Sequence, residues 1–446
     1  AVSEVDPSSS AMSPSTSMLA LLGMPLIAFA VRSKQAHSVV SNVRLVGGVP
    51  SSALNSYDLM EPELMEFPPR HHNSFQLSDA TSASKDSLLF KSRLRYLMSS
   101  ECNLGKTLKV EKMAYSGFGG SLHNLVKPSL YAMKYGYCLK FPKHSSLYGN
   151  LDNYFETFSA QSKLDQHSQC TTCSADDFEA EPPCDPKLEV QVGRFMAGNC
   201  RREMKIVDAS AQDVVPRSFA KMAVMEAVSN VVSTLYEPSK KMQSSVADAK
   251  KSMNWPVDRN VIGLHVRRGD SCNDDSQEWR TVTCFPLSKY MQLVDRAATK
   301  YRIKDIFLTS EAPATFEETK KYPYYNWMFL NTTFTPVPSG KNIENAIDDG
   351  DLDGVSVGED AHSNLLLLSE ASVIIGKFTS NLPRLALEYK TGKTSLVCPY
   401  YSLDSSWCFA YGEEYPLSKL ASDDVERHLV TKTEDQDFND VHKFYC

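Results

Sequence analysis

The sequence predicts an α/β protein in which helices cover both faces of parallel sheets. The first observation behind this prediction is a regular alternation of short apolar runs with longer amphipathic segments across residues 256–400. Apolar runs rich in Val and Ile are typical of strands buried on both faces, and helices connect one parallel strand to the next. The second observation is that the run Val261–Leu264 leads directly into a polar turn from His265 to Gly269. Ligands bind at this end of a strand in an open α/β sheet.

The C-terminal half divides into elements that repeat in the order strand, then helix. Strands are expected at Val261–Val266, Asp305–Thr309, Asn326–Leu330, Ser372–Ile375 and Thr394–Cys398. Helices are expected at Pro286–Tyr301, Ala312–Lys321, His362–Glu370 and Asn381–Tyr389. This order predicts one doubly wound sheet in this half of the chain.

The N-terminal half has fewer clear elements. We expect an amphipathic helix at Lys85–Met98 and strands at Thr107–Met113 and Cys138–Phe141. The stretch Ser218–Met253 has helical character and is interrupted at Glu237-Pro238. Because proline cannot continue a helix, this stretch should form two helices rather than one.

Composition and charge narrow the possible functions. The chain has 446 residues, which is long enough for two domains of ordinary size. Charged residues make up 23% of the chain and hydrophobic residues 42%, as in a globular protein. The formal net charge of −7 argues against a nucleic-acid-binding surface. No repeat of the length typical of solenoids recurs, so a solenoid is not expected.

The segment His265-Val-Arg-Arg-Gly-Asp270 is the most informative part of the sequence. Guanidinium groups are planar, stay charged and match phosphate oxygens in two-point contacts, so Arg267 and Arg268 suit a nucleotide diphosphate. Taken alone, the same residues could form a surface Arg-Asp pair beside a core strand. For His265, a core histidine is the alternative to a ligand-binding one.

A second polar turn follows the expected strand at 372–375. Thr379 and Ser380 precede the expected helix, and hydroxyl groups with free backbone N–H groups at a helix N-terminus bind anions well. The alternative is that Thr379, Ser380 and Asn381 are plain helix caps. The turn therefore supports an anion site only in combination with the arginine segment.

Together, the two segments resemble the donor-binding half of the fucosyltransferases that use GDP-fucose, most closely the core α1,6-fucosyltransferases. That family has a His-x-Arg-Arg-x-Asp segment followed by a Phe-Ser-Ser-x-x-x-Arg turn, and this chain has His265–Asp270 and Phe378–Arg384. A third segment, Tyr115–Val126, resembles the Gly-aromatic-Gly turn of the family, and Gly117 and Gly119 in it would allow close approach to a ligand.

The resemblance covers roughly residues 107–397 and implies the GT-B fold, in which two Rossmann-like doubly wound domains face a cleft. From the composition of the residues before this span, we expect an N-terminal apolar segment and stem over residues 1–100, followed by an acceptor-side Rossmann-like domain over 101–255. A domain that binds the GDP-sugar would follow over 256–400, and a C-terminal extension over 401–446. We expect no counterpart of the SH3-like domain that the animal core α1,6-fucosyltransferases carry.

The resemblance also implies roles for individual residues. The donor substrate would be GDP-fucose, with no cofactor, and the leaving diphosphate would be held by Arg267, Arg268, Thr379 and Ser380 without a metal ion. His265 matches a family residue that contacts the nucleotide. The short acidic segment Asp351-Leu-Asp353 lies among Gly and Asp residues, where solvated turn residues are expected rather than metal ligands.

Two positions depart from the family pattern. The family has a Lys directly after the Asp of the arginine segment and a Glu four residues later, whereas this chain has Ser271 and Asp275. Asp275 is then the expected catalytic base, alongside Arg268 as the second catalytic residue. Asn364 stands where the family has an Asp that reads the guanine base, and an amide offers a single acceptor oxygen.

Two classes of function remain open from the sequence. The first is an inverting, metal-independent glycosyltransferase that moves fucose from GDP-fucose to a glycan or glycoprotein. The second is a GT-B-like protein without catalysis that serves as a structural or interaction subunit.

The chain contains eleven cysteines, which is many for a reducing compartment. Cys170-Thr-Thr-Cys173, followed by Cys184 and Cys200, could hold zinc, but the second pair lacks the usual close spacing, so disulfides are favoured. The odd count leaves one thiol over, for which Cys272 and Cys446 are candidates.

The N-terminal region bears on localisation. Met18–Val31 is an apolar run that contains Pro25, too short for a confident spanning helix and close to the length of a signal-peptide core. It could instead be a membrane anchor or a helix that contacts a partner. Asn331-Thr-Thr333 is an N-glycosylation sequon. We therefore expect a membrane-anchored glycoprotein of the secretory pathway, in the Golgi lumen.

Overall fold

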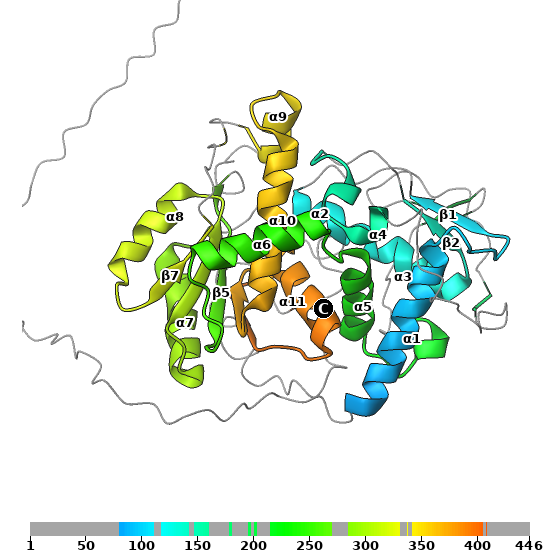
Figure 1. Cartoon of the computed structure of the whole chain (residues 1–446), viewed down its shortest axis with the longest axis horizontal. Coiled ribbons are helices and arrows are strands. Elements are labelled where there is room, and N and C mark those ends of the chain that lie inside the picture. Colours follow the sequence, from blue (N-terminus) through cyan, green and yellow to red (C-terminus); the bar gives the residue numbers. More distant parts are fainter. Residues whose placement is uncertain are drawn as a thin grey trace, which may run out of the picture. The chain divides into compact units, whose positions relative to one another are not determined.

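The structure is a computed structural model that describes residues 80–110, 117–141, 147–159, 178–180, 195–197, 200–202, 215–269, 284–330, 337, 341–404 and 407. Asp270, Ser271, Asp275 and the apolar run Met18–Val31 lie outside these residues. The predicted α/β class is confirmed by two sheets with surrounding helices (Figure 1).

The C-terminal half contains a five-stranded sheet in the order β7-β6-β5-β8-β9, and all of its strand pairs are parallel. The strands are β5 Val261–Val266, β6 Asp305–Ser310, β7 Asn326–Met328, β8 Val373–Gly376 and β9 Tyr400–Ser402. β5 occupies the centre and pairs with β6 along its whole length. The strand order reverses between β5 and β8, which is the position where ligands bind in sheets of this type.

Helices connect successive strands of this sheet, as parallel pairing requires. They are α7 Leu287–Tyr301, α8 Pro313–Glu318, α9 Ile343–Asp348, α10 Gly354–Glu370 and α11 Asn381–Thr394, and the 3-10 helix η7 Thr319–Lys321 follows α8. α7 and α10 both contact β5 (Figure 1). The doubly wound arrangement expected for this half is therefore confirmed.

Two helices of the C-terminal half are longer than the sequence pattern predicts. α10 begins at Gly354 rather than at His362, because the Asp353 side chain caps it by accepting from the Ser356 N–H at 3.0 Å. α11 continues to Thr394, so the predicted strand Thr394–Cys398 is wrong. The last strand of the sheet, β9, lies further along the chain.

The continuation of α11 has a packing cause. A Cβ atom on Gly392 would lie 2.1 Å from the Ser229 carbonyl oxygen, so only glycine allows the two helices to approach this closely. Ser229 belongs to α5 Val224–Leu235, which packs along α11. The local pattern around Gly392 suggests a helix end, but the long-range contact keeps the glycine inside the helix.

The N-terminal half contains a smaller, mixed sheet in the order β2-β1-β3-β4. Its strands are β1 Thr107–Val110, β2 Cys138–Lys140, β3 Phe195–Ala197 and β4 Cys200–Arg202. β1 and β2 are parallel, as expected from the two predicted strands, and β3 and β4 form an antiparallel hairpin beside β1. The described part of this sheet is thus less regular than that of the C-terminal half.

The helices of the N-terminal half include the predicted pair before β5. The break at Glu237-Pro238 is confirmed, because α5 ends at Leu235 and α6 begins at Lys240. The other helical elements are α1 Ala80–Met98, α2 Phe118–His123, α3 Val126–Tyr135, α4 Glu156–Ser159, η1 Leu151–Asn153, η5 Arg217–Phe219 and α6 Lys240–Ser252. α5 contacts both α1 and α11, so it joins the apolar cores of the two halves.

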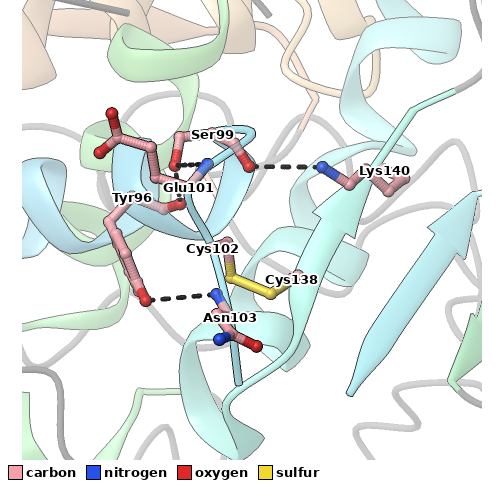
Figure 2. The surroundings of a disulfide bond; sticks show 7 residues. All are labelled: Tyr96, Ser99, Glu101, Cys102, Asn103, Cys138 and Lys140. Atoms are coloured by element: carbon pink, nitrogen blue, oxygen red, sulfur yellow. Dashed lines mark hydrogen bonds between the residues drawn. A yellow bond between two sulfur atoms is a disulfide. The ribbon is translucent and has the colours of Figure 1, made fainter. Parts of the chain in front are cut away.

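One disulfide fixes the start of the first sheet. Cys102 and Cys138 are bonded, with their Cα atoms 5.6 Å apart, and link the end of α1 to β2 (Figure 2). Beside it, the Lys140 ammonium donates to the Ser99 carbonyl at 3.3 Å, and the Asn103 N–H donates to the Tyr96 hydroxyl at 3.4 Å. This disulfide was not singled out from the sequence.

The other cysteines are described only in part. Cys398 is a buried free thiol and Cys284 is disulfide-bonded. The side chains of the predicted cluster 170–200 and both candidates for the unpaired thiol, Cys272 and Cys446, lie outside the described residues. Within the described ranges, none of the helices combines the length and the apolar character needed to span a bilayer.

Candidate active site

Four strands of the parallel sheet deliver charged side chains to its carboxyl edge. Arg267 follows β5, Glu311 follows β6, Lys377 follows β8 and Asp404 follows β9. Because the carboxyl ends of parallel strands meet at one edge, residues far apart in the sequence come together here. This edge includes the switch between β5 and β8, and it is the position predicted for the anion site.

Arg267 lies at this edge and forms an ion pair with Glu311. Its side chain remains 28% exposed. Gly269 turns the chain away directly afterwards with a φ of +74°, and a Cβ there would lie 2.9 Å from Glu311 Cγ. The glycine is therefore required both for the positive φ and for the approach of Glu311.

Arg268 is engaged by several groups of the protein. Its Nη1 donates to Glu318 Oε1 at 2.6 Å and its Nη2 donates to Glu318 Oε2 at 3.3 Å. Its Nε donates to the Phe285 carbonyl at 3.3 Å, and Nη1 also lies 3.4 Å from the Thr315 hydroxyl. Arg268 thus connects the end of β5 to α8 and to the segment before α7. The Arg268 hydrogen bonds hold the pKa of Glu318 below its usual range.

The turn between β8 and α11 binds an anion that the chain itself supplies. Asp404 Oδ1 accepts from the Phe378 N–H at 2.9 Å and from the Thr379 N–H at 3.3 Å. The Thr379 hydroxyl donates to Asp404 Oδ2. In this structure the anion at this turn is the side-chain carboxylate of Asp404.

Ser380 occupies the start of α11 and has a different environment from Thr379. Its backbone N–H donates to the Lys377 carbonyl at 3.0 Å, and its side chain makes no capping hydrogen bond. The hydroxyl of Ser380 is half-buried at the positive end of the helix. Of the two hydroxyls predicted to hold the diphosphate, that of Ser380 is the one not committed to Asp404.

The glycines of the third motif have another role than the predicted one. Gly117 is the N-cap of α2 with a φ of −47°, and Gly119 lies within that helix. The segment predicted to be a turn is therefore the start of a helix, and neither glycine has a positive φ. A Cβ on Gly119 would lie 3.0 Å from Asn381 Cβ and 3.3 Å from the Leu382 nitrogen. Gly119 is needed because α2 packs directly on the first turn of α11.

A contact between His123 and the buried Glu388 reinforces this packing of α2 on α11. His123 Nε2 lies 2.7 Å from Glu388 Oε2, and His123 Nδ1 lies 2.8 Å from Asn381 Oδ1. The Trp407 indole N–H donates to Glu388 Oε1 at 2.7 Å. Burial opposes ionisation of Glu388, but His123, Arg384 and Trp407 outweigh it and hold its pKa below the usual range.

Sequence reasoning did not find this cluster, although His123 lies inside the motif quoted for the resemblance. His123, Glu388 and Trp407 come from three segments whose proximity is created only by the fold. A histidine directly after an apolar helix position was the one available signal.

His265 is buried on β5, and its Nδ1 has no hydrogen-bond partner among the residues that the structure describes. Burial, with the positive charges of Arg267 and Lys377, lowers its pKa to about 3. At neutral pH the imidazole is therefore uncharged. The open alternative of a core histidine fits this burial.

The remaining predicted residues are scattered. Asn364 lies in α10, where its side-chain amide donates to the Asp360 carbonyl at 2.9 Å. Gly117 lies near Glu344, since a Cβ there would be 3.7 Å from Glu344 Oε1. Asp270 and Asp275 cannot be placed, because they fall outside the described ranges.

The acidic segment before α10 carries out structural tasks. Lys341 forms ion pairs with Asp349, at 2.7 Å, and with Asp351, at 2.5 Å. Asp353 caps α10. The interpretation of Asp351 and Asp353 as turn residues agrees with these contacts. In the described part of the chain, no three His, Cys, Asp or Glu side chains cluster as metal ligands would.

Residues 217–406 match the sequence model of a family described as alpha-(1,6)-fucosyltransferase N- and catalytic domains. No curated protein matches the chain. Among solved structures, NodZ alpha-1,6-fucosyltransferase co-crystallized with GDP aligns at 14% identity and a TM-score of 0.36, covering 66% of this chain and 96% of that one. NodZ from Bradyrhizobium aligns at 13% identity and a TM-score of 0.35, with coverages of 66% and 96%.

POFUT1 in complex with GDP aligns at 11% identity and a TM-score of 0.27, covering 42% of this chain. The chain thus spans about half, 53%, of the POFUT1 structure that it matches. The family match carries more weight, because its span contains both the arginine turn after β5 and the turn between β8 and α11. Over residues 217–406, which are less than half of the chain, the protein is therefore similar to the alpha-(1,6)-fucosyltransferase N- and catalytic domains.

Proposed function

We propose that the protein transfers fucose from GDP-fucose to a glycan or glycoprotein acceptor, with inversion at the sugar carbon and without a metal ion. The proposal rests on one observation. Arg267 follows β5 and the β8–α11 turn follows the neighbouring strand β8, so both lie at the switch point of the parallel sheet. The match of residues 217–406 to the fucosyltransferase family model supports the choice of donor.

The chemistry of the donor explains why positive groups are needed at this edge. When the bond between fucose and GDP breaks, negative charge develops on the β-phosphate and positive charge on the sugar. Arg267 and the N-terminus of α11 present positive charge and N–H groups to the leaving diphosphate. The uncharged His265 lies behind them and contributes shape rather than charge.

The acceptor hydroxyl must lose a proton during transfer, which calls for a base on the same edge. Asp275 is proposed for this role from its place in the sequence, five residues after Asp270. The segment that carries it leaves the sheet at Gly269, directly after the two arginines. It therefore starts next to the proposed diphosphate site.

Two measurements on the purified full chain test the proposal. Calorimetry with GDP and with GDP-fucose should give binding of both, and incubation of GDP-fucose with a panel of N-glycan acceptors should release GDP and form a fucosylated product. NMR of the product would give the anomeric configuration. Absence of GDP binding would contradict the proposal.

A second candidate function is favoured by one specific observation. The carboxylates of Glu311, Glu318 and Asp404 already contact Arg267, Arg268 and the β8–α11 turn, so the protein supplies its own anions to the predicted diphosphate site. A protein that uses this fold for binding or structure alone would show such contacts. GDP binding without turnover over the whole acceptor panel would favour this second function.

We also propose that the protein resides in the secretory pathway, in the Golgi lumen. The Cys102–Cys138 disulfide supports an oxidising compartment. To test this, the protein from cells is treated with N-glycosidase, and its mass should fall. The variant Asn331→Gln should show no such change in mass. A fully cytosolic protein with an unmodified Asn331 would contradict it.

A further inference from the structure

The turn between β8 and α11 owes its shape to a residue beyond the last strand of the sheet. Asp404 lies two residues after β9, yet its carboxylate sits within hydrogen-bond distance of two consecutive backbone N–H groups, those of Phe378 and Thr379. The Ser402 hydroxyl donates to the same carboxylate oxygen, Oδ1, at 3.0 Å. The carboxylate is therefore held by backbone donors of the β8–α11 turn and by a side-chain donor of β9.

The second oxygen of this carboxylate is engaged as well. Oδ2 accepts from the Thr379 hydroxyl and lies 3.7 Å from the Lys377 ammonium. The side chains of Lys377 and Asp404 are only 3% and 6% exposed. A carboxylate with this many donors in a buried site is costly to move, because each donor would lose its partner away from water.

This arrangement divides the turn into two parts. The N–H groups of Phe378 and Thr379 and the Thr379 hydroxyl face Asp404 and are not available to a ligand. The Ser380 hydroxyl and the first amides of α11 come next in the chain, at the positive end of the helix dipole. A ligand phosphate would meet this second part.

We propose that Asp404 is a positioning residue of the donor site, which holds the turn 377–380 so that Ser380 and the first turn of α11 face the diphosphate. Thr379 serves the turn and does not bind the ligand. This inference rests on the proposed function, since it names what arranges the same site. It assigns the contact with the diphosphate to Ser380 rather than to both hydroxyls.

Asp404 also affects the charge of Lys377. Burial and, to a lesser degree, Arg267 lower the pKa of Lys377, while Asp404 opposes both. Among the described residues, the charged or titratable groups that interact with Lys377 include Asp404 from the end of β9, Arg267 from the end of β5, and His265 on β5. Removing the charge of Asp404 should therefore lower the pKa of Lys377 further and make the ammonium lose its proton at a lower pH.

The test compares GDP affinity, measured by calorimetry between pH 6.5 and 9, in the full chain and three variants. Asp404→Asn should weaken GDP binding about tenfold or more at neutral pH, since the turn loses a charged acceptor, and the loss should grow as pH rises and Lys377 loses its proton. Ser380→Ala should weaken binding by a factor that does not change with pH. Asp295→Asn, which removes a carboxylate that accepts from Tyr325 on the outside of the sheet, should bind GDP as the wild type does.

The outcomes separate the inference from the proposed function. If the wild type does not bind GDP, the proposed function fails and the inference fails with it. If the wild type binds GDP and Asp404→Asn binds it equally at every pH, only the inference is overturned. A purely structural effect of Asp404→Asn, with a loss of affinity that is constant across the pH range, also overturns it.

A measurement on the wild type covers the case in which Asp404→Asn does not fold. Backbone amide exchange followed by NMR should show the Phe378 and Thr379 N–H groups protected before GDP is added, with new protection on GDP binding at Asn381 and Leu382. Exchange of Phe378 and Thr379 that is fast without GDP and slow with it would mean that these N–H groups bind the ligand. That result would overturn the role of Asp404.

Discussion

The Arg268 guanidinium and the Glu318 carboxylate form a two-point contact, with one nitrogen–oxygen distance of 2.6 Å and a second of 3.3 Å. Arg267, next to it in the sequence, pairs with Glu311 through one guanidinium nitrogen and keeps a larger exposed fraction, 28% against 16%. Adjacent arginines that look equivalent in the sequence thus occupy different surroundings. Arg268 links elements of the protein, whereas Arg267 keeps the more exposed side chain.

This difference predicts different results for two matched substitutions. Arg267→Lys should weaken GDP binding by about 2 kcal/mol, the size of a lost charged hydrogen bond, with little change in the free energy of unfolding. Arg268→Lys should lower the free energy of unfolding by about 1–3 kcal/mol, because lysine cannot reproduce the contacts to Glu318 and Phe285. Calorimetry and chemical denaturation measure the two quantities. Equal effects of both variants on GDP affinity, without a loss of stability, would contradict the assignment.

A matched pair of glycine substitutions tests the contact between α2 and α11. Gly119→Ala should destabilise the protein by about 1–3 kcal/mol, because its Cβ would crowd Asn381. Gly117→Ala places its Cβ in ordinary contact, 3.7 Å from Glu344 Oε1, and should cost less than that. Thermal and chemical denaturation of both variants would check this. A loss of GDP affinity in Gly117→Ala at unchanged stability would instead restore the ligand-facing role predicted from the sequence.

The pH dependence of stability should reflect two buried histidines. Burial lowers the pKa of His362 to about 3, and the pKa of His265 is lowered to the same value. Unfolded histidines take up protons near pH 6.5, whereas these two resist protonation until about pH 3. The unfolded state therefore binds more protons between these values, and stability should fall as pH drops through this window.

His362→Phe isolates one of these contributions, since His362 packs among the rings of Phe118, Tyr154 and Phe155. Urea denaturation between pH 7 and pH 4 should show a slope for the variant that is smaller by up to about 1.4 kcal/mol per pH unit. If the free energy of unfolding changed with pH equally in the variant and the wild type, His362 would have to be protonated in the folded protein.

Metal independence can be tested directly on any transferase activity. If Arg267 and the α11 N-terminus neutralise the leaving diphosphate, EDTA should leave the rate of GDP release unchanged within error. Activity that disappears with EDTA and returns with Mn²⁺ would point to a metal-dependent mechanism and to acidic ligands outside the described residues.

The sequence predicted the parts of the fold that depend on local chemistry. β5 and the turn after it follow from an apolar run, two arginines and Gly269, and the position of Pro238 separated α5 from α6. The sequence did not predict the end of α11, because Gly392 stays helical only through its contact with Ser229 on another helix. Local patterns record propensity, whereas this boundary depends on packing between distant segments.

The candidate site was predicted in position but not in its internal contacts. Its arginines and hydroxyls were identified because they follow apolar strands. Their partners Glu311, Glu318 and Asp404 were not identified, since each lies on another element and has no motif of its own. The same holds for the His123–Glu388 pair. A sequence without aligned relatives shows which groups are available, and the fold decides which of them meet.

Whether the chain is an enzyme depends on a base for the acceptor hydroxyl, and Asp275 is the proposed one. Removing a general base typically lowers the rate by a factor of about a hundred to ten thousand while leaving donor binding nearly unchanged. Asp275→Asn should therefore keep GDP affinity within a few-fold and lose most turnover. Asp274→Asn and Glu278→Gln are the matched controls, because they remove neighbouring carboxylates from the same segment. If Asp275→Asn turns over normally while one of these controls is inactive, the base is that neighbour. If all three variants are active, the acceptor is deprotonated by a residue outside this segment.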